Sequence, residues 1–389
     1  MTPAARVAAA CEVLDQILDG MPAEKALTGW ARRSRFAGSG DRAALRDLVF
    51  DALRRKRSLA ALGGALTGRG LMIGLVRAEG GDVDALFTGQ GHAPDHLSDN
   101  EKVAGRAPEP GAEAGDMPDW LWPDLCRSLG EQTGAVAAVL QARAPIMLRV
   151  NTRKSGVRAA QIALAEQGII TQVDPVASTA LRVVEGARRV AQSTAYLSGL
   201  VELQDGSSQA VIGRLCPVSS GKILDFCAGG GGKSLTLAAA GGADIFAHDI
   251  QPGRMKDLPA RAARAGVRIT MLENRQVAAH APFDLVLCDA PCSGSGAWRR
   301  APEGKWLLTR ERLDELTRIQ DSILAQAAGL VAPSGVLAYA TCSVLKAENE
   351  DRIAAFLAQY PDWHQIGMDR WTPGPSGDGF FLSRLQRVA

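Results

Sequence analysis

Residues 223–233 are Ile223-Leu224-Asp225-Phe226-Cys227-Ala228-Gly229-Gly230-Gly231-Gly232-Lys233, an apolar run that ends in four consecutive glycines. The run has the length of a buried strand, and a helical pattern follows from residue 234. A glycine loop between a strand and a helix lets backbone N–H groups approach a polar ligand. From Lys222 onward, strand-like runs and helical patterns alternate as far as Gln359. This alternation predicts a doubly wound, Rossmann-like parallel α/β sheet.

The glycine loop fits neither of two common phosphate-binding patterns. A P-loop would need a glycine where Cys227 stands, and the third glycine of the dinucleotide pattern falls on Ser234 or Leu235. Asp249 ends the next predicted strand, at the position expected for a ligand of ribose hydroxyls. These features suit S-adenosylmethionine, an adenosine derivative without phosphates. The alternative is a glycine turn that serves close packing only.

Two further apolar runs each deliver a cysteine to their carboxyl end. Residues 283–288 precede Asp289-Ala290-Pro291-Cys292-Ser293-Gly294, and residues 335–340 precede Thr341-Cys342-Ser343. Carbon 5 of a pyrimidine becomes nucleophilic only after a thiolate adds to carbon 6, so thiols beside a methyl donor suit pyrimidine methylation. Alternatively, both cysteines are small buried hydrophobic residues, and the enzyme methylates a protein or a small molecule.

At these residues the chain resembles the Sun/RsmB-type RNA (cytosine-5) methyltransferases of the bacterial 16S rRNA branch. The resemblance spans roughly residues 116–389. Its motifs are residues 148–151, 204–205, 208–209, 225–233, 289–296, 299–300, 305–306, 339–343, 348–350 and 378–381. It implies that Cys342 is the nucleophile and that Cys292 assists release of the methylated base. Asp289 would hold the edge of the pyrimidine. The expected reaction is methylation of carbon 5 of a cytosine in RNA, with 16S rRNA preferred over tRNA. A non-catalytic role in ribosome assembly is the remaining alternative.

The expected S-adenosylmethionine site combines the glycine loop with residues that follow the next strands. Its predicted members are Cys227, Ala228, Gly229, Gly230, Gly231, Gly232, Lys233, Asp249, Asn274 and Asp289. Two positions depart from the family pattern. Gly229-Gly230 stands where the family has Ala-Pro, and Asn274 stands near the usual place of an aspartate beside the adenine. An asparagine can still form hydrogen bonds with adenine, so we expect weaker binding rather than none.

Residues 1–70 resemble the NusB-like helical RNA-binding domain of the bacterial branch. We expect four segments: the NusB-like domain (1–70), a linker region (71–116), a small RRM-like α/β RNA-binding subdomain (117–200) and the methyltransferase domain (201–389). Basic residues would contact RNA phosphates, and the candidates are Arg54, Arg55, Lys56, Arg57, Arg149, Arg299 and Arg300. The alternative for the run at 54–57 is a solvated helix face.

Composition sets further limits on the class of protein. The chain of 389 residues is 46% hydrophobic and 22% charged, and lacks the apolar stretch of about 18 residues that a membrane span needs. Its seven cysteines are odd in number and include no Cys-x-x-Cys pair, so we expect neither a disulfide framework nor a metal site. The net charge of +2 neither requires nor excludes RNA. Composition makes a cytoplasmic protein the expectation, and the resemblance implies a protein, expected to be a monomer, that has RNA as its partner.

Overall fold

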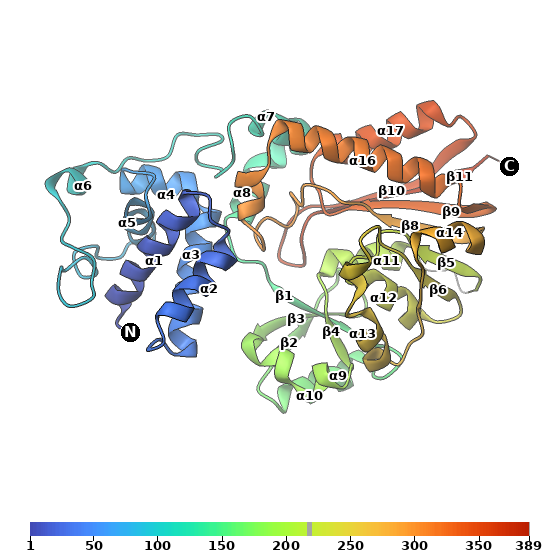
Figure 1. Cartoon of the computed structure of the whole chain (residues 1–389), viewed down its shortest axis with the longest axis horizontal. Helices are drawn as coiled ribbons and strands as arrows, with labels where there is room; N and C mark the ends of the chain where they lie inside the picture. Colours follow the sequence, from blue (N-terminus) through green and yellow to red (C-terminus); the bar gives the residue numbers. More distant parts are fainter. Residues whose placement is uncertain (216–219, 389) are drawn as a thin grey trace. The chain divides into compact units, whose positions relative to one another are not determined.

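Figure 1 shows the computed structural model, which describes residues 1–215 and 220–388. Residues 216–219, which include Cys216, and residue 389 lie outside the described part of the chain. The chain divides into two units. Unit 1 consists of Met1–Arg143 together with Trp298–Leu307, and unit 2 of Ala144–Ala297 together with Leu308–Ala389. A short segment of the C-terminal half therefore belongs to the N-terminal unit.

Unit 1 consists of helices and the turns that join them. Its elements are α1 (Pro3–Leu18), α2 (Ala23–Arg33), α3 (Ser39–Arg54), α4 (Lys56–Gly63), α5 (Gly68–Ala78), α6 (Asp99–Val103), α7 (Trp122–Leu129), η1 (Gly130–Gln132), α8 (Thr133–Leu140) and α15 (Glu303–Leu307). Helix α1 begins where the Thr2 side chain accepts a hydrogen bond from the N–H of Ala5. Helices α4 and α5 pack so closely that only a glycine fits at position 74. A Cβ on Gly74 would lie 2.0 Å from the carbonyl oxygen of Leu59. Within the described residues no individual helix has the length and hydropathy of a membrane span; α4 and α5 reach them only when joined across an 88° bend.

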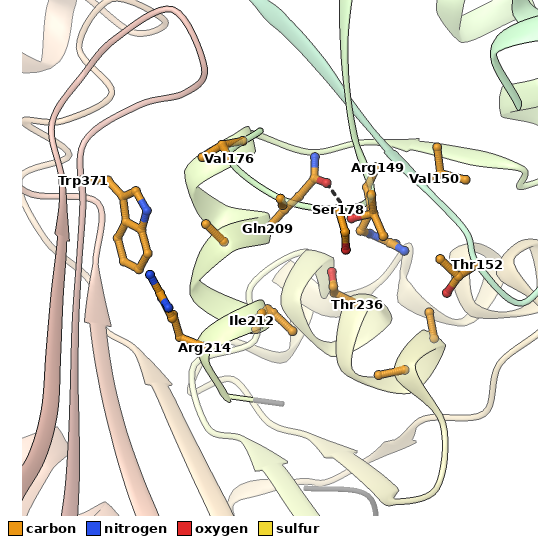
Figure 2. Close-up of a pocket in the computed structure, with 16 residues that line it drawn as sticks. Arg149, Val150, Thr152, Val176, Ser178, Gln209, Ile212, Arg214, Thr236 and Trp371 are labelled. Atoms are coloured by element: carbon orange, nitrogen blue, oxygen red, sulfur yellow. Dashed lines mark hydrogen bonds between the residues drawn. The ribbon is translucent and has the colours of Figure 1, made fainter. Parts of the chain in front are cut away.

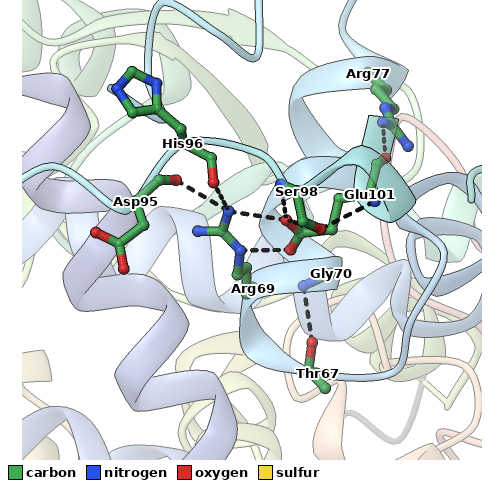
Figure 3. A network of polar contacts seen from close by, with 8 residues as sticks. All are labelled: Thr67, Arg69, Gly70, Arg77, Asp95, His96, Ser98 and Glu101. Atoms are coloured by element: carbon green, nitrogen blue, oxygen red, sulfur yellow. Dashed lines mark hydrogen bonds and ion pairs between the residues drawn. The ribbon is translucent and has the colours of Figure 1, made fainter. Parts of the chain in front are cut away.

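Polar contacts tie the segment after α5 to that helix (Figure 3). The Arg69 guanidinium on α5 pairs with Glu101 on α6 at 2.6 Å and donates to the carbonyl oxygens of Asp95 and His96 at 3.0 and 3.1 Å. The hydrogen bond from the Arg69 guanidinium to the Glu101 carboxylate lowers the pKa of Glu101 to about 2. Ser98 and Glu101 also form a capping box at the start of α6. These contacts attach the start of α6 and the residues before it to α5.

Residues 71–116 contribute to the apolar core of unit 1. Leu71, Phe87 and Leu97 are buried in the same cluster as the side chains of α1 and α3. The helical unit consequently continues past residue 70, and residues 71–116 differ from the linker expected from their glycine and proline content. In this segment the apolar residues stand in short runs between glycines and show no helical periodicity. The sequence pattern therefore gives little sign that they pack into the core.

Unit 2 begins with a small antiparallel sheet of strand order β2-β3-β1-β4. Its elements are β1 (Ile146–Val150), α9 (Val157–Ala165), β2 (Ile170–Val173), β3 (Ala180–Glu185), η2 (Ala187–Gln192), α10 (Thr194–Leu197) and β4 (Val201–Leu203). The succession βαββαβ with this strand order is ferredoxin-like, the topology that RRM-like folds share. The last strand lies beyond residue 200, where we expected the subdomain to end.

The rest of unit 2 is a seven-stranded sheet of order β10-β11-β9-β8-β5-β6-β7. Its strands are β5 (Lys222–Asp225), β6 (Asp244–Ala247), β7 (Thr270–Met271), β8 (Phe283–Asp289), β9 (Val331–Thr341), β10 (Trp363–Trp371) and β11 (Phe380–Arg387). Its helices are α11 (Gly206–Leu215), α12 (Gly232–Ala240), η3 (Pro252–Met255), α13 (Leu258–Ala265), α14 (Asn274–His280), α16 (Arg310–Ala328), η4 (Lys346–Glu348) and α17 (Glu350–Gln359). The strands β5 to β9 pair in parallel, which confirms the predicted Rossmann-like class. The antiparallel strands β10 and β11 were not predicted.

The order of these parallel strands places five carboxyl ends along one edge of the sheet. The loops after β5, β6, β8 and β9 contain the glycines, Asp249, Cys292 and Cys342 respectively. An open parallel sheet binds its ligands at this edge, near the point where the strand order reverses beside β5. The fold therefore gathers the predicted residues at one place.

Candidate functional site

The glycine loop joins β5 to α12 at this edge. Gly229 and Gly231 have φ values of +54° and +79°, which glycine adopts without steric strain. A Cβ on Gly231 would lie 2.3 Å from Leu258 Cδ1, whereas a Cβ on Gly232 would meet nothing within 4 Å. Open space thus lies beside the first N–H groups of α12, which have no partner inside the helix. The loop leaves room for a polar ligand there.

Asp249 is buried directly after β6 and supports the glycine loop. Its Oδ2 accepts hydrogen bonds from the Gly229 N–H at 2.9 Å and from Arg254 Nη1 at 3.1 Å. Its Oδ1 accepts from the Gln251 N–H at 2.9 Å. Because the Arg254 side chain is 55% exposed, a ligand hydroxyl can take its place on Oδ2 at small cost. Asp249 therefore both shapes the loop and offers an acceptor.

Asn274, at the start of α14, contacts the ring of His248. The Nδ1 of His248 lies 2.8 Å from the carbonyl oxygen of Phe226, and its Nε2 lies 2.8 Å from the side-chain amide of Asn274. A carbonyl oxygen only accepts, so His248 donates through Nδ1. The atom of Asn274 that faces Nε2 is Oδ1, so the amide NH₂ group of Asn274 is the part left to donate to a ligand such as adenine.

Three ionisable side chains, those of Lys233, Asp289 and Asp225, lie in or next to the glycine loop. Lys233 Nζ is 2.6 Å from Asp289 Oδ2 and 4.9 Å from the centre of the Phe380 ring. Burial lowers the pKa of Lys233, but Asp289 and its neighbours outweigh this effect, so the net shift is upward and the ammonium keeps its charge. Burial raises the pKa of Asp225 to about 7, although the Ser234 hydroxyl donates to its Oδ2 at 2.6 Å. Among the described residues, Asp289 Oδ1 has no partner and is available as an acceptor.

The two predicted thiols meet at this edge, with the Sγ atoms of Cys292 and Cys342 3.4 Å apart. The hydrogen bond to Cys342, followed by burial, raises the pKa of Cys292 well above its ordinary range. Cys292 therefore favours its neutral thiol form, and either sulfur can donate in this contact. The Lys233 ammonium interacts electrostatically with Cys342. The two thiols thus have different surroundings.

Glu348 connects the two cysteine loops. It is fully buried, and its carboxylate accepts hydrogen bonds from the N–H of Ser293 at 2.7 Å and from the hydroxyl of Ser343 at 2.5 Å. These serines directly follow Cys292 and Cys342. The hydroxyl of Ser293 also donates to the carboxylate, and the side-chain amide of Gln320 donates to Oε1 at 3.2 Å. Glu348 was not among the predicted site residues, and its place within a family motif was its only signal in the sequence.

The other described cysteines do not extend this site. Burial raises the pKa of Cys227 and Cys288 well above the ordinary range, so both remain neutral thiols. Cys227 lies in the glycine loop and is partly buried, in keeping with a role in shaping the pocket. Across residues 1–215 and 220–388, no group of three or more His, Cys, Asp or Glu side chains could hold a metal ion.

Most of the basic candidates for RNA contacts have protein partners. Arg54 and Arg299 are only 6% and 2% exposed, and Arg54 Nε donates to the carbonyl oxygen of Arg299 at 2.7 Å. Lys56 lies 4.2 Å from the ring centre of Trp306, and Arg57 pairs with Asp119 at 2.6 Å. Arg54 and Arg299 do not line any of the described pockets, so an RNA contact through either would need a rearrangement and stays a prediction. The half-buried Arg55 and the exposed Arg300 remain candidates, and Arg149 lines a separate pocket.

The same contacts show how residues 298–307 are held in unit 1. Lys305 Nζ and Trp306 Nε1 each donate to a carbonyl oxygen at the end of α3, those of Arg54 and Leu53, at 2.8 Å. Glu303 accepts from the N–H of Ala23 at the start of α2, also at 2.8 Å. The last carbonyls and first amides of helices lack partners within the helix, so this segment caps two helices at once. We call residues 298–307 the capping segment.

This site is typical of a methyltransferase. It combines a glycine loop, carboxylates at strand ends and two cysteine thiols on a Rossmann-like sheet. Comparison with known sequences agrees. The family described as 16S rRNA methyltransferase RsmB/F matches residues 213–386, and the ferredoxin-like domain of RsmF/B-like methyltransferases matches residues 117–190. The chain belongs to this RsmB/RsmF methyltransferase family.

Individual relatives and structures give the same result. The ribosomal RNA small subunit methyltransferases B of Klebsiella pneumoniae subsp. pneumoniae and Citrobacter koseri are 34% and 33% identical over 283 and 282 residues. These alignments cover 69% of this chain but only 65% and 66% of the relatives. The crystal structure of PH0851 superposes with a TM-score of 0.77 at 25% identity, covering 100% of this chain and 99% of that one. NSun6 from Pyrococcus horikoshii with SFG has a TM-score of 0.61 at 17% identity, covering 70% and 98%, and supports the fold.

Proposed function

We propose that this protein methylates carbon 5 of a cytosine in RNA, with 16S ribosomal RNA as the substrate, through a covalent adduct with Cys342. The observation that carries the proposal is the pair of thiols 3.4 Å apart beside the glycine loop. Methyl transfer to nitrogen or oxygen needs no thiol, whereas carbon 5 of a pyrimidine needs a nucleophile at carbon 6. Two adjacent thiols at a methyltransferase site therefore favour pyrimidine chemistry.

The residues at the sheet edge fit S-adenosylmethionine, the cofactor of this class. The open space beside Gly232 suits the approach of a polar group to the N–H groups of α12. Asp249 offers its carboxylate to ribose hydroxyls, and the Asn274 amide lies one strand further along, where an adenine would be held. When bound, S-adenosylmethionine supplies an electrophilic methyl group.

The residues of the chain perform the remaining steps. The Cys342 thiolate forms a bond to carbon 6 of the cytosine, which shifts an electron pair toward carbon 5. After methylation, carbon 5 gives its proton to a water molecule, the electron pair of that C–H bond forms the double bond between carbons 5 and 6, and the Sγ–carbon 6 bond breaks, which restores the aromatic base and the thiolate. Cys292 is the neutral thiol that contacts Cys342 throughout, so it is placed to assist this release. The Lys233 ammonium stabilises the thiolate at the start and the end.

Asp289 supplies a reason for choosing cytosine over uracil. The Lys233 ammonium donates to its Oδ2 at 2.6 Å, and its Oδ1 is available. An ionised carboxylate only accepts hydrogen bonds. Cytosine presents an amine at position 4, whereas uracil presents a carbonyl that the carboxylate would repel. The Asp289 side chain thus matches a cytosine edge.

Support for a ribosomal RNA substrate comes from the relatives named above, whose printed names specify small-subunit ribosomal RNA. This chain aligns with about two-thirds of their length, so the substrate is part of the proposal. The target cytosine must be unpaired or flipped, because a thiol cannot reach carbon 6 inside a stacked helix. Unit 1 and the ferredoxin-like subdomain are the proposed RNA-binding parts, and the NusB-like character of unit 1 stays a prediction.

Bisulfite sequencing of total RNA from cells with and without the gene tests the proposal directly. We expect one cytosine of 16S rRNA to lose its protection when the gene is absent, and to regain it when the wild-type gene, but not the Cys342→Ala gene, is restored. If the cytosine whose protection depends on the gene lies in tRNA, the substrate is tRNA and not 16S rRNA. No change at any cytosine, combined with methyl transfer to a protein, would reject the proposal.

A further inference from the structure

A pocket of about 350 Å³ lies within unit 2, apart from the cysteine site (Figure 2). The ferredoxin-like subdomain contributes β1 and the turn at residues 176–179, and helices α11 and α12 and the end of β10 form the other walls. Polar lining residues include Arg149, Thr152, Ser178, Gln209, Arg214 and Thr236. None of these side chains takes part in the proposed methyl transfer.

Arg149 is the central charged group of this pocket. It is 2% exposed, and its Nε donates to Gln204 Oε1 at 2.6 Å. Among the described residues, its two terminal amino groups have no hydrogen-bond partner. Four N–H donors of a buried cation are therefore directed into the pocket without an acceptor. These amino groups reach the open space of the pocket, so a ligand that accepts several hydrogen bonds can pair with them there.

Around the pocket, guanidinium groups outnumber the carboxylates that could balance their charge. Glu202 lies opposite Arg149 in the register of β1 and β4. Its carboxylate already pairs with Arg264 at 2.7 Å and with Arg261 at 3.4 Å. One carboxylate thus serves three guanidinium groups. Arg214 at the rim of the pocket is paired with Asp369 at 3.1 Å and does not change this balance. The pocket has an excess of positive charge.

We propose that this pocket binds a phosphate group of the RNA backbone, with Arg149 as the bidentate donor. Two terminal amino groups in one plane match two oxygens of a phosphate. The hydroxyl of Ser178, at the exposed mouth of the pocket, is placed to add a further donor. That the phosphate belongs to RNA rests on the function proposed above, whereas the anion site itself rests on Arg149 and the pocket.

The test measures binding of the full-length protein to a 16S rRNA fragment that contains the target cytosine, over a range of salt concentrations. Arg149→Met keeps the length of the side chain and removes its charge. We expect RNA affinity to fall about tenfold or more and the salt slope to decrease by about one. The dissociation constant for S-adenosylmethionine should stay the same. Arg158→Met, an equal charge change on the exposed face of α9, is the matched control and should leave RNA affinity unchanged.

Ser178→Asp provides a second test, because it places a carboxylate at the exposed mouth of the pocket and leaves Arg149 in place. We expect the same loss of RNA affinity, so the proposal can be tested even if Arg149→Met does not fold. Unchanged RNA affinity in both variants would overturn it. Binding of inorganic phosphate that depends on Arg149, without an effect on RNA, would show a small-anion site instead. These binding assays need no turnover, so failure of methylation would count against the proposed function only.

Discussion

The Sγ atoms of Cys292 and Cys342 lie 3.4 Å apart, within contact distance but without a covalent bond. Their surroundings differ, because a hydrogen bond to Cys342 and burial keep Cys292 protonated, while Lys233 interacts with Cys342. These different surroundings suit separate tasks for the two sulfurs. This asymmetry agrees with the roles that the family resemblance implies.

The first prediction separates these roles. Cys342→Ala should abolish methylation and form no adduct, because it removes the attacking sulfur. Cys292→Ala should still attack and methylate, yet stall before release, so that RNA stays attached to Cys342. A denaturing gel with labelled RNA and S-adenosylmethionine should show a slowly migrating band for Cys292→Ala only. The opposite pattern would mean that the two roles are exchanged.

The second prediction concerns Glu348, which holds the loops of both thiols. Glu348→Gln keeps the volume but replaces one acceptor by a donor, which faces Ser293 and Ser343, both donors to the carboxylate. We expect kcat to fall at least tenfold with little change in the KM for either substrate, because the thiols lose their relative position. Thiol alkylation rates should change as well.

Glu350→Gln is the matched control for that experiment. Glu350 lies two residues further on and pairs with Arg370 at 2.9 Å, away from the serines that follow the two thiols. Its substitution should leave thiol alkylation rates unchanged. Equal rates in wild-type protein and Glu348→Gln would show that Glu348 does not position the thiols.

The third prediction tests the cofactor site. Asp249→Ala removes the acceptor for the Gly229 N–H and for ribose hydroxyls, and should weaken S-adenosylmethionine binding by about 1–3 kcal/mol. Calorimetry measures this directly. Asp257→Ala, at an exposed position before α13, is the control and should bind normally. Unchanged affinity of Asp249→Ala would remove Asp249 from the site.

The fourth prediction uses Lys305 of the capping segment. Burial lowers the pKa of Lys305 to about 7 from an ordinary value of 10.5. Between these values the unfolded chain binds a proton that the folded chain does not, so the free energy of unfolding rises with pH across this window. The stabilisation is fully present only above pH 10.5 and is lost as the pH falls toward 7. Lys305→Met should flatten this dependence by up to a few kcal/mol, measured by urea unfolding from pH 7 to pH 10. Parallel pH profiles for the two proteins would contradict the assignment.

The sequence predicted the parts of this molecule that follow from local patterns. The strand–glycine–helix segment at residues 223–240 and the strands that precede Cys292 and Cys342 lie within a few residues of their predicted places. Strand β10 was not recognised, because a register shift between Gln365 and Gly367 interrupts its alternation of apolar and polar residues. Strand β11 was not recognised, because its first four residues are all buried and do not alternate. The contact between Glu348 and Ser293 joins residues 55 positions apart, and no local pattern reveals such a pair. The same holds for Arg54 and Arg299, whose burial depends on tertiary packing alone.

The capping segment also determines how this protein can be divided. The Lys305 ammonium and the Trp306 indole find their acceptors only on α3, so removing residues 1–70 strips both groups of their partners while leaving them in the chain. In such a truncated protein the indole of Trp306 would be exposed, and we expect the protein to aggregate. The two units should therefore behave as obligate halves: residues 1–143, supplied as a separate polypeptide, should reassemble with residues 144–389 and restore their solubility, as split proteins do when one fragment completes the helix ends of the other.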